Sequence, residues 1–360
     1  MQVIVANRKK AIVLLCGFLI VGCETVAWYG QAVSGQLSLL SKRQNIDRLL
    51  QQSDLDNDLR AQLRTVKNLT AFAEQHLHLP VGKTFTSYVD LQRPAKQNHV
   101  VWNVFAAPEF SVEPHYWCYP IAGCAQYRGY FSAEAAQNYA EILRSNSLDA
   151  AVGGVAAYST LGWFADPILS TFVHYPEQRL AALVFHELAH KILYIADDTE
   201  FNESFATSVE VWGLKQWLRS LGREHELGRI EKHQQARSKF LAIIAQLRQD
   251  LESAYSDKNL DDDQRRTRKE QLFSQYRAKA NSLSDPYFAR WLESIDSNAS
   301  LIPIQSYTRW TKGFTALLNQ HSGDMPAFYE AVKTLSTMSP EQRHTELQYL
   351  TETAGEAVQE

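Results

Sequence analysis

A 22-residue stretch, FHELAHKILYIADDTEFNESFA at residues 185–206, constrains the fold more than any other part of the chain. His186 and His190 lie four residues apart, so on a helix both imidazoles share one face and can bind one metal ion. Glu187 then lies about 100° further round the helix, within reach of a water on that ion. Apolar residues keep helical spacing on both sides of the motif, so we predict one helix over residues 176–196.

The third metal ligand is expected on a second helix that returns antiparallel to the first. Asp198 or Thr199 can cap the N-terminus of this helix after a turn. Glu203 lies about four residues further on, which at the rise of a helix is nearly level with His190. We therefore predict Glu203 as the third ligand.

Two other glutamates of the returning helix, Glu200 and Glu210, remain alternatives for the third ligand. Glu210 lies two turns beyond Glu203, closer to the level of His186. This position suits an acceptor for the N–H of a ligand imidazole. Two His, one Glu and an open fourth position are typical of a catalytic zinc site, so we expect one Zn²⁺ per chain.

The N-terminus has the pattern of an export signal. Arg8, Lys9 and Lys10 precede an 11-residue apolar run, which is too short to span a bilayer. The run ends in IVGC, which resembles a bacterial lipobox, so we expect cleavage after residue 22 and lipid attachment at Cys23. Glu24 favours the outer membrane, with the protein facing the periplasm. The alternative is an ordinary signal peptide with a chance cysteine.

Two further cysteines support export. Cys118 and Cys124 are separated by five residues that include a proline and a glycine, so they can close a small loop. The periplasm keeps such pairs oxidised, and a zinc knuckle would need four ligands at tighter spacing. We predict a disulfide, with two buried free thiols as the alternative.

Sequence periodicity predicts an α+β, predominantly helical chain. Apolar spacing predicts helices over residues 37–52 and 56–77, and the strand-rich segments are 84–91, 99–107 and 152–164. From Pro176 onward the chain is mainly helical and includes two long helices joined near residues 261–263, whose charged faces we expect to be solvated. The expected segments are a signal peptide (1–22), an N-terminal helical segment (23–80), a catalytic core with a small β-sheet and the zinc-site helices (81–220), and a C-terminal helical region (221–360).

Charge gives little support for nucleic-acid binding. Loss of residues 1–22 removes three positive charges and moves the formal net charge from −4 to −7. No basic patch interleaved with aromatic residues is present. We therefore expect no nucleic-acid partner, the membrane is expected as a partner through the lipid on Cys23, and the sequence does not identify any protein partner.

Four blocks of the sequence resemble the successive signature blocks of a bacterial family named "putative aminopeptidases", which are zinc-dependent and gluzincin-like. The blocks are CYPIAGCAQYRGYF, GGVAAYSTLGWFADPIL, FHELAHK and FNESFATSVE, and the resemblance runs from about Trp28 to the C-terminus. It implies a gluzincin-like core in which His186, His190 and Glu203 bind zinc and Glu187 is catalytic. The chain lacks the glycine-rich motif with an acidic anchor for the substrate amine that is found in the well-studied zinc aminopeptidases.

The expected reaction is zinc-assisted hydrolysis of a peptide bond. Zinc lowers the pKa of its water toward 7 and polarises the scissile carbonyl, while Glu187 transfers the proton to the leaving amine. In gluzincin-like enzymes a Tyr or His from a neighbouring segment stabilises the oxyanion. Tyr307 is the first candidate for this catalytic role and His174 the second. The strand-like segment that contains Gly153 and Gly154 is expected to be either an edge strand that pairs with the peptide or a core strand.

Three alternative functions explain the residues of this site to different extents. A lipid-anchored zinc metalloendopeptidase would use the same site on internal bonds. A non-catalytic zinc-binding envelope lipoprotein would have no need of Glu187, and a purely structural lipoprotein would leave the whole His-Glu-His cluster unexplained.

Overall fold

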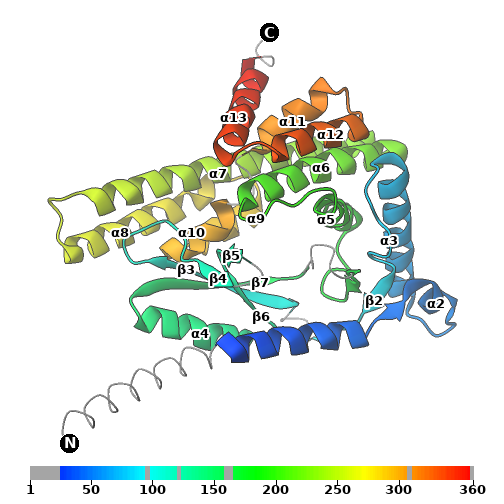
Figure 1. Ribbon diagram of the computed structural model, residues 1–360, viewed down its shortest axis with the longest axis horizontal. Coiled ribbons are helices and arrows are strands. Elements are labelled where there is room, and N and C mark those ends of the chain that lie inside the picture. Colours follow the sequence, from blue (N-terminus) through cyan, green and yellow to red (C-terminus); the bar gives the residue numbers. More distant parts are fainter. Residues whose placement is uncertain (1–24, 94–97, 120–122, 158–164, 306–309, 357–360) are drawn as a thin grey trace, which may run out of the picture.

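The computed structural model describes residues 25–93, 98–119, 123–157, 165–305 and 310–356, and in these residues helices predominate over small sheets (Figure 1). The predicted α+β, mainly helical class is confirmed. Besides a helix over residues 25–41, the helices are α2 (Ile46–Gln51), α3 (Asn57–His76), α4 (Ala133–Ser145), α5 (Glu177–Ala189), α6 (Thr199–Ser220), α7 (Leu227–Ser256), α8 (Asp262–Arg277), α9 (Pro286–Glu293), α10 (Asn298–Gln305), α11 (Thr311–Gln320), α12 (Met325–Ser336) and α13 (Pro340–Glu356). The strands are β1 (Gln44–Asn45), β2 (Ser87–Val89), β3 (Val101–Pro108), β4 (Trp117–Tyr119), β5 (Gly123–Ala125), β6 (Arg128–Tyr130), β7 (Leu148–Val155) and β8 (Ile168–Leu169).

The sheet with the longest strands has the order β6-β3-β7, and both pairings are antiparallel. Helix α4 contacts one face of this sheet and α10 the other. Alternation along β3 explains the two layers, since successive side chains of a strand point to opposite faces. Trp102, Val104 and Ala106 pack with α4, whereas Phe105 and Ala107 pack with α10. A second sheet joins β1, β2 and β8.

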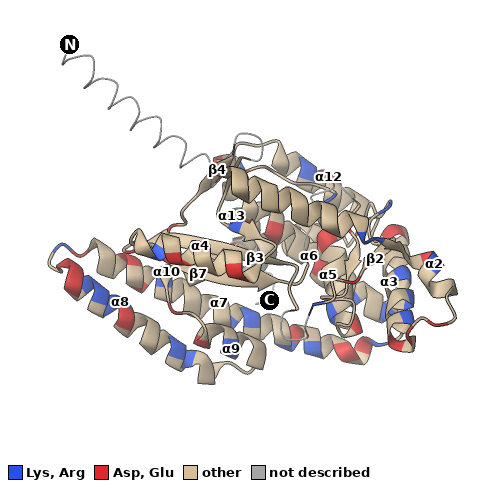
Figure 2. Ribbon diagram, turned by 90° about the horizontal axis from the view of Figure 1, so that it is seen from below, with Lys and Arg blue, Asp and Glu red and all other residues tan. Residues whose placement is uncertain are grey.

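Two long helices, α7 and α8, form the predicted hairpin, and α8 begins where the sequence indicated. Asp261 and Gln264 form a reciprocal capping box at its N-terminus. Acidic and basic residues follow one another along α8, as red and blue bands on its ribbon (Figure 2). The inner faces are apolar and bury Phe240 and Leu247 of α7 against Phe273 of α8. The charged faces are thus mostly solvated, as expected.

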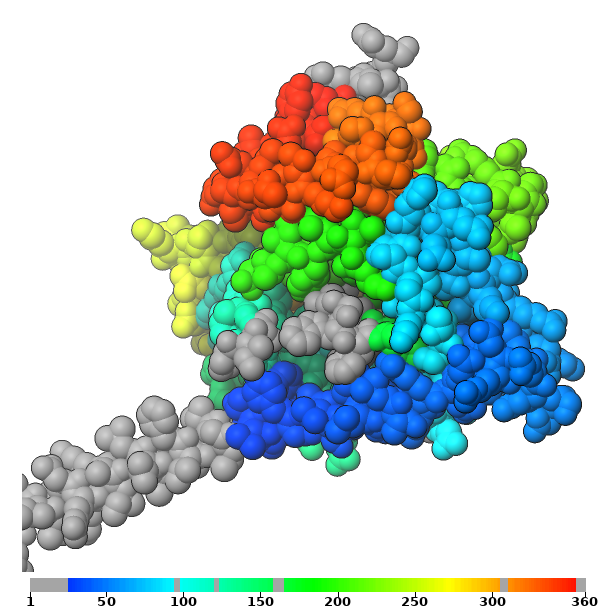
Figure 3. All heavy atoms as spheres, turned by 45° about the vertical axis from the view of Figure 1, so that its right-hand side comes forward, coloured from blue at the N-terminus to red at the C-terminus, as the bar shows by residue number. Residues whose placement is uncertain are grey.

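Helix α6 lies at the centre of the largest apolar cluster. The C-terminal helices α11–α13 lie over it, as orange and red atoms over green ones in Figure 3. Phe201 and Phe205 of α6 contact the Phe314 ring of α11, with ring centroids 5.0 and 5.9 Å apart. A Cβ atom on Gly213 would lie 2.9 Å from the Phe185 ring of α5, so this glycine allows the two helices to approach closely.

The prediction of one helix over residues 37–52 is wrong. The first described helix ends at residue 41, and β1 interrupts the helical pattern by pairing with β2 before α2 begins. This tertiary pairing overrides local helical spacing. Cys23 and the predicted signal lie outside the described residues, and in the described part of the chain no helix is long and apolar enough to cross a membrane.

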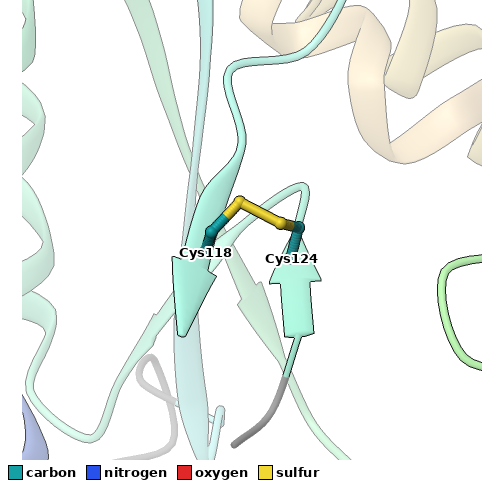
Figure 4. Close-up of a disulfide and its surroundings, with 2 residues drawn as sticks. All are labelled: Cys118 and Cys124. Atoms are coloured by element: carbon teal, nitrogen blue, oxygen red, sulfur yellow. A yellow bond between two sulfur atoms is a disulfide. The ribbon is translucent and has the colours of Figure 1, made fainter. Parts of the chain in front are cut away.

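The predicted disulfide is confirmed. Strands β4 and β5 pair so that Cys118 lies directly opposite Cys124, and the two sulfur atoms are bonded (Figure 4). Gly123 takes a positive φ of 73°, and a Cβ atom there would lie 3.3 Å from the carboxylate of Asp197. The disulfide hairpin therefore lies against the connection between α5 and α6.

Candidate metal centre and active site

The predicted helix around the HExxH motif is confirmed as α5, but it is shorter than expected. His190 caps its C-terminus, and the prediction that it extends to about Ala196 is wrong. Asn202 holds the following segment, because its side chain accepts a hydrogen bond from Ile195 N–H and donates one to Ile195 C=O. Asn202 is buried, so these bonds hold the segment in a turn despite its helix-like apolar spacing.

Helix α6 begins at the predicted turn. Asp197 adopts the left-handed conformation with a φ of 63°. Asp198 is the N-cap, and its carboxylate accepts a hydrogen bond from Phe201 N–H at 3.1 Å. This start places Glu203 at the level of His190.

Three side chains from α5 and α6 converge at one point: His186, His190 and Glu203. The two Nε2 atoms of the histidines are 3.2 Å apart. The carboxylate oxygens of Glu203 lie 3.2 Å from Nε2 of His186 and 3.6 Å from Nε2 of His190. The ligand atoms of the three residues all lie within 4.8 Å of one another, so the group could hold a metal ion.

The spacing and donor chemistry of this group fit a four-coordinate metal. Ligand atoms about 2.0–2.1 Å from a tetrahedral zinc ion lie roughly 3.3 Å apart, close to the distances between these side chains. Two imidazole nitrogens favour a transition metal over calcium or magnesium. Oε2 of Glu203 is buried and forms no hydrogen bond with the described residues, as expected for an atom that faces a cation. Within the described residues no fourth acidic, His or Cys side chain joins the group.

Glu210 is not one of the three converging residues but contacts the other ring nitrogen of His186. Its Oε2 lies 3.0 Å from Nδ1 of His186. This contact favours the tautomer in which Nδ1 carries the proton and Nε2 is free to bind a metal. Glu203 is therefore the glutamate that completes the group, while Glu210 orients one of its histidines.

Protonation of the two histidines differs in the metal-free protein. Burial lowers the pKa of His186, but the carboxylates of Glu203 and Glu210, 3.2 and 3.0 Å from its two ring nitrogens, outweigh burial and raise the pKa well above its ordinary value. Burial and the charge of His186 lower the pKa of His190 to about 4. Metal binding at Nε2 of His186 therefore competes with its protonation, so we expect metal affinity to fall as the pH falls.

Glu210→Gln should weaken metal binding or turnover by about 10- to 100-fold without abolishing either, because the neutral amide holds the His186 ring less firmly. Metal affinity by competition with a chelator, together with turnover, provides the measurement. Glu231→Gln, at an exposed position on α7, is the matched control and should change neither. Complete loss of metal from Glu210→Gln would instead identify Glu210 as a ligand.

Glu187 lies beside the metal group and lines a small cavity with room for about one water-sized group. Asp166 and several apolar side chains form the rest of the lining: Phe85, Ala157, Pro167, Phe172 and Leu183. Glu187 makes no hydrogen bond or ion pair with any described residue. Burial raises its pKa to about 7, and the positive charge of His186 opposes this shift. A carboxylate in this state can accept and release a proton near neutral pH.

Other residues considered for the site lie elsewhere. Tyr307 is outside the described residues. His174 is exposed and precedes the first turn of α5, whereas His186 and His190 lie at the opposite end of that helix, so His174 is not brought to the metal group. The charge of Glu200 acts on Arg248 of α7, and Glu200 is not part of the metal group.

Strand β7 corresponds to the start of the strand predicted over residues 152–164, of which 158–164 lie outside the described residues. In the described sheet β7 pairs with β3 alone and so forms an edge. A Cβ atom on Gly154 would lie 2.5 Å from the His99 ring, so this glycine accommodates a side chain of the protein itself. Beyond β7, the chain reaches the cavity beside Glu187 at Ala157.

Two residues near the site were not expected from the sequence. Tyr194 lies in the connection between α5 and α6, and partial burial and the charge of Glu203 raise the pKa of its hydroxyl. Arg237 of α7 helps to lower the pKa of Glu203 through its positive charge, although burial acts in the opposite direction. Tyr194 could have been found from its place between the two metal-binding segments, whereas nothing local distinguishes Arg237 from the other charged residues of α7.

Comparison with known proteins gives one finding. The model of a family described as "Putative aminopeptidase" matches residues 27–347. Neither a curated protein nor a solved structure matches the chain. The matched residues cover most of the sequence and include the metal group and Glu187. The chain therefore belongs to the putative aminopeptidase family, whose description indicates a peptide hydrolase.

Proposed function

We propose that the protein is a zinc-dependent aminopeptidase with a gluzincin-like catalytic core, anchored to the bacterial cell envelope by lipid on Cys23. The main support is the convergence of His186, His190 and Glu203 at distances suited to tetrahedral zinc. Glu187, directly beside them, has no structural partner among the described residues. This favours a catalytic centre over a purely structural metal site.

Bound zinc would supply Lewis acidity that activates water and polarises a carbonyl. Glu187 would take the proton of the attacking water and pass it to the leaving amine, and burial, which raises its pKa to about 7 in the metal-free protein, favours its holding that proton between the two steps. Glu210 keeps His186 oriented throughout.

A hydroxyl donor for the oxyanion would complete the mechanism. Tyr194 is a candidate within the described residues, since its partly exposed side chain lies within electrostatic reach of Glu203. Tyr307 remains the candidate derived from the sequence.

The cavity beside Glu187 favours an aminopeptidase over an endopeptidase. An ammonium group is about the size of a water molecule, and Glu187 and Asp166 are the two acidic residues among those that line a space of that size. The α-nitrogen of a substrate lies only two bonds from the scissile carbonyl carbon, so an ammonium there would place this carbon near Glu187. Asp166 also interacts electrostatically with Arg43 and Lys191. In addition to binding the substrate ammonium, it would therefore have a structural role.

The lipid anchor and the periplasmic location are proposed from the IVGC sequence that ends at Cys23. The disulfide between Cys118 and Cys124 supports an oxidising compartment, because such bonds rarely persist in the cytosol. Glu24 after the cysteine favours the outer membrane.

Metal content and substrate preference test the proposal together. The mature protein should bind about one zinc per chain and cleave leucine anilide far faster than its N-acetylated form, and chelation should abolish both the metal and the activity. His186→Ala and His190→Ala should lose zinc, whereas the control His225→Ala, at an exposed position, should keep it.

The alternatives give different results in the same assays. Equal cleavage of free and N-acetylated substrates, or of internal bonds in long peptides, would identify an endopeptidase. Bound zinc without hydrolysis of any peptide would favour a zinc-binding lipoprotein. Carefully prepared wild-type protein without zinc would rule out the proposed mechanism.

A further inference from the structure

The helix over residues 25–41 contains no Lys, Arg, Asp or Glu, which is unusual for a helix on the protein surface. It is the dark blue helix along the lower edge of the molecule in Figures 1 and 3. In Figure 2 the helix that follows the N-terminal trace is tan throughout, whereas α3 and α8 carry blue and red bands. The absence of charged side chains suggests that the exposed face of this helix is not fully solvated and contacts another apolar surface.

One face of this helix docks on the body of the protein. The indole of Trp28 stacks on the Tyr119 ring, with centroids 4.6 Å apart, and donates a hydrogen bond to Gly129 C=O. A Cβ atom on Gly35 would collide with the Phe131 ring, so the helix packs tightly there. These contacts and buried Leu39 fix which face of the helix points outward.

The outward face is an apolar stripe, formed by Val26, Tyr29, Val33 and Leu37, of which Tyr29 also makes an edge contact with the Tyr119 ring. Their spacing of three, four and four residues aligns them along one side of the helix. The exposed fractions are 70, 39, 57 and 59%. Single exposed apolar residues are ordinary, but an aligned set is not. Of the large aliphatic side chains exposed in the described residues, Val26, Val33 and Leu37 are in this stripe and only Ile142 and Leu221 are elsewhere.

The position of the stripe identifies its partner. Cys23, the proposed lipid attachment point, lies two residues before the helix, a span of at most about 7 Å. A lipid on Cys23 would therefore hold the start of the helix at the bilayer surface. The helix has 17 described residues, fewer than the roughly 20 needed to cross a bilayer, and it is docked along its length on the protein.

We propose that the stripe Val26–Tyr29–Val33–Leu37 lies on the membrane surface and inserts its side chains among the lipids. It provides a second contact beside the lipid anchor and fixes the orientation of the protein on the bilayer. Because the helix carries no basic residue, the contact is apolar, and it should depend little on anionic lipids or on salt. The inference rests on the proposed lipid anchor at Cys23 and is independent of the proposed peptidase activity.

Vesicle binding of the mature Cys23→Ser protein, which has no lipid, tests this contact. The protein should co-float with phosphatidylcholine vesicles, and Val33→Ser with Leu37→Ser should reduce the partition coefficient about tenfold or more. The control pair Ile142→Ser with Leu221→Ser removes equally apolar side chains, 49 and 43% exposed, elsewhere on the surface and should have no effect. Serine matches the neighbouring Ser34 and Ser38, so the helix should stay folded, which circular dichroism checks.

Three outcomes would overturn the inference: no vesicle binding by the Cys23→Ser protein, equal losses in the stripe variant and the control, or binding that appears only with anionic lipids and disappears in salt. A dimer in light scattering that the stripe variant converts to a monomer would assign the stripe to a second copy of the chain. None of these measurements uses hydrolysis, so they leave the proposed peptidase activity untouched, and fatty-acid labelling of the wild-type chain tests the lipid on Cys23 separately.

Discussion

Glu187→Gln is expected to leave the metal content at the wild-type level while lowering kcat for peptide hydrolysis by about 10²- to 10⁴-fold. Glutamine has nearly the same shape as glutamate but cannot take a proton from water. Glu187 lies outside the metal group, so its charge is not needed to hold the ion. Metal analysis and steady-state kinetics on the same sample provide the measurement.

Glu203→Gln is the matched comparison, because it makes the same chemical change one helix away. It replaces a charged oxygen within 3.2 Å of His186 by a neutral amide, so zinc affinity should fall severely and activity should fall with it. Added zinc should partly restore the activity of Glu203→Gln and leave the low activity of Glu187→Gln unchanged. If excess zinc restores Glu187→Gln instead, Glu187 is a ligand and the division of roles is wrong.

The metal group could be predicted because its determinants are local. Spacing of four residues places His186 and His190 on one face of a helix, and Asp198 marks where the next helix starts. With these two facts, the rise of a helix brings Glu203 level with His190. The extent of α5 was predicted wrongly, yet the metal group was not affected, since the short segment that replaces its last turns still returns the chain to Asp198.

Features made by distant parts of the chain could not be predicted in this way. Asn202 ends the helical pattern by bonding the backbone of Ile195, and β1 ends another by pairing with β2. Helical spacing is unchanged in both segments, so periodicity alone cannot find these breaks. Arg237 is 34 residues from Glu203 in sequence, and only the packing of α7 beside α6 brings its charge to the site.

The contact between Asp198 and Arg343 of α13 joins residues 145 positions apart and is the basis of a second prediction. Nε and Nη2 of Arg343 donate hydrogen bonds of 2.9 and 2.6 Å to Oδ2 of Asp198. The other oxygen of Asp198 caps α6, which carries Glu203 and Glu210. The Arg343 and Asp198 side chains are only 4 and 9% exposed. The last described helix thus stabilises the turn that positions the metal ligand.

Arg343→Met should lower the free energy of unfolding by about 3–5 kcal/mol, because it leaves the buried Asp198 carboxylate with only the partly exposed imidazole of His344, 3.4 Å away, beside it. Denaturant unfolding of the metal-free protein measures this loss. Lys333→Ala is the control, since it breaks an exposed ion pair with Glu330 and should cost no more than about 1 kcal/mol.

Asp198→Asn separates the charge of Asp198 from its capping role, because the amide oxygen can still accept the hydrogen bond from Phe201 N–H. Combined with Arg343→Met, it removes both charges and should recover a large part of the stability that Arg343→Met alone loses. The double variant should also retain zinc better than Arg343→Met, since the start of α6 is no longer disturbed by an unpaired charge. Simple additivity of the two losses would show that the ion pair does not couple α13 to the metal site.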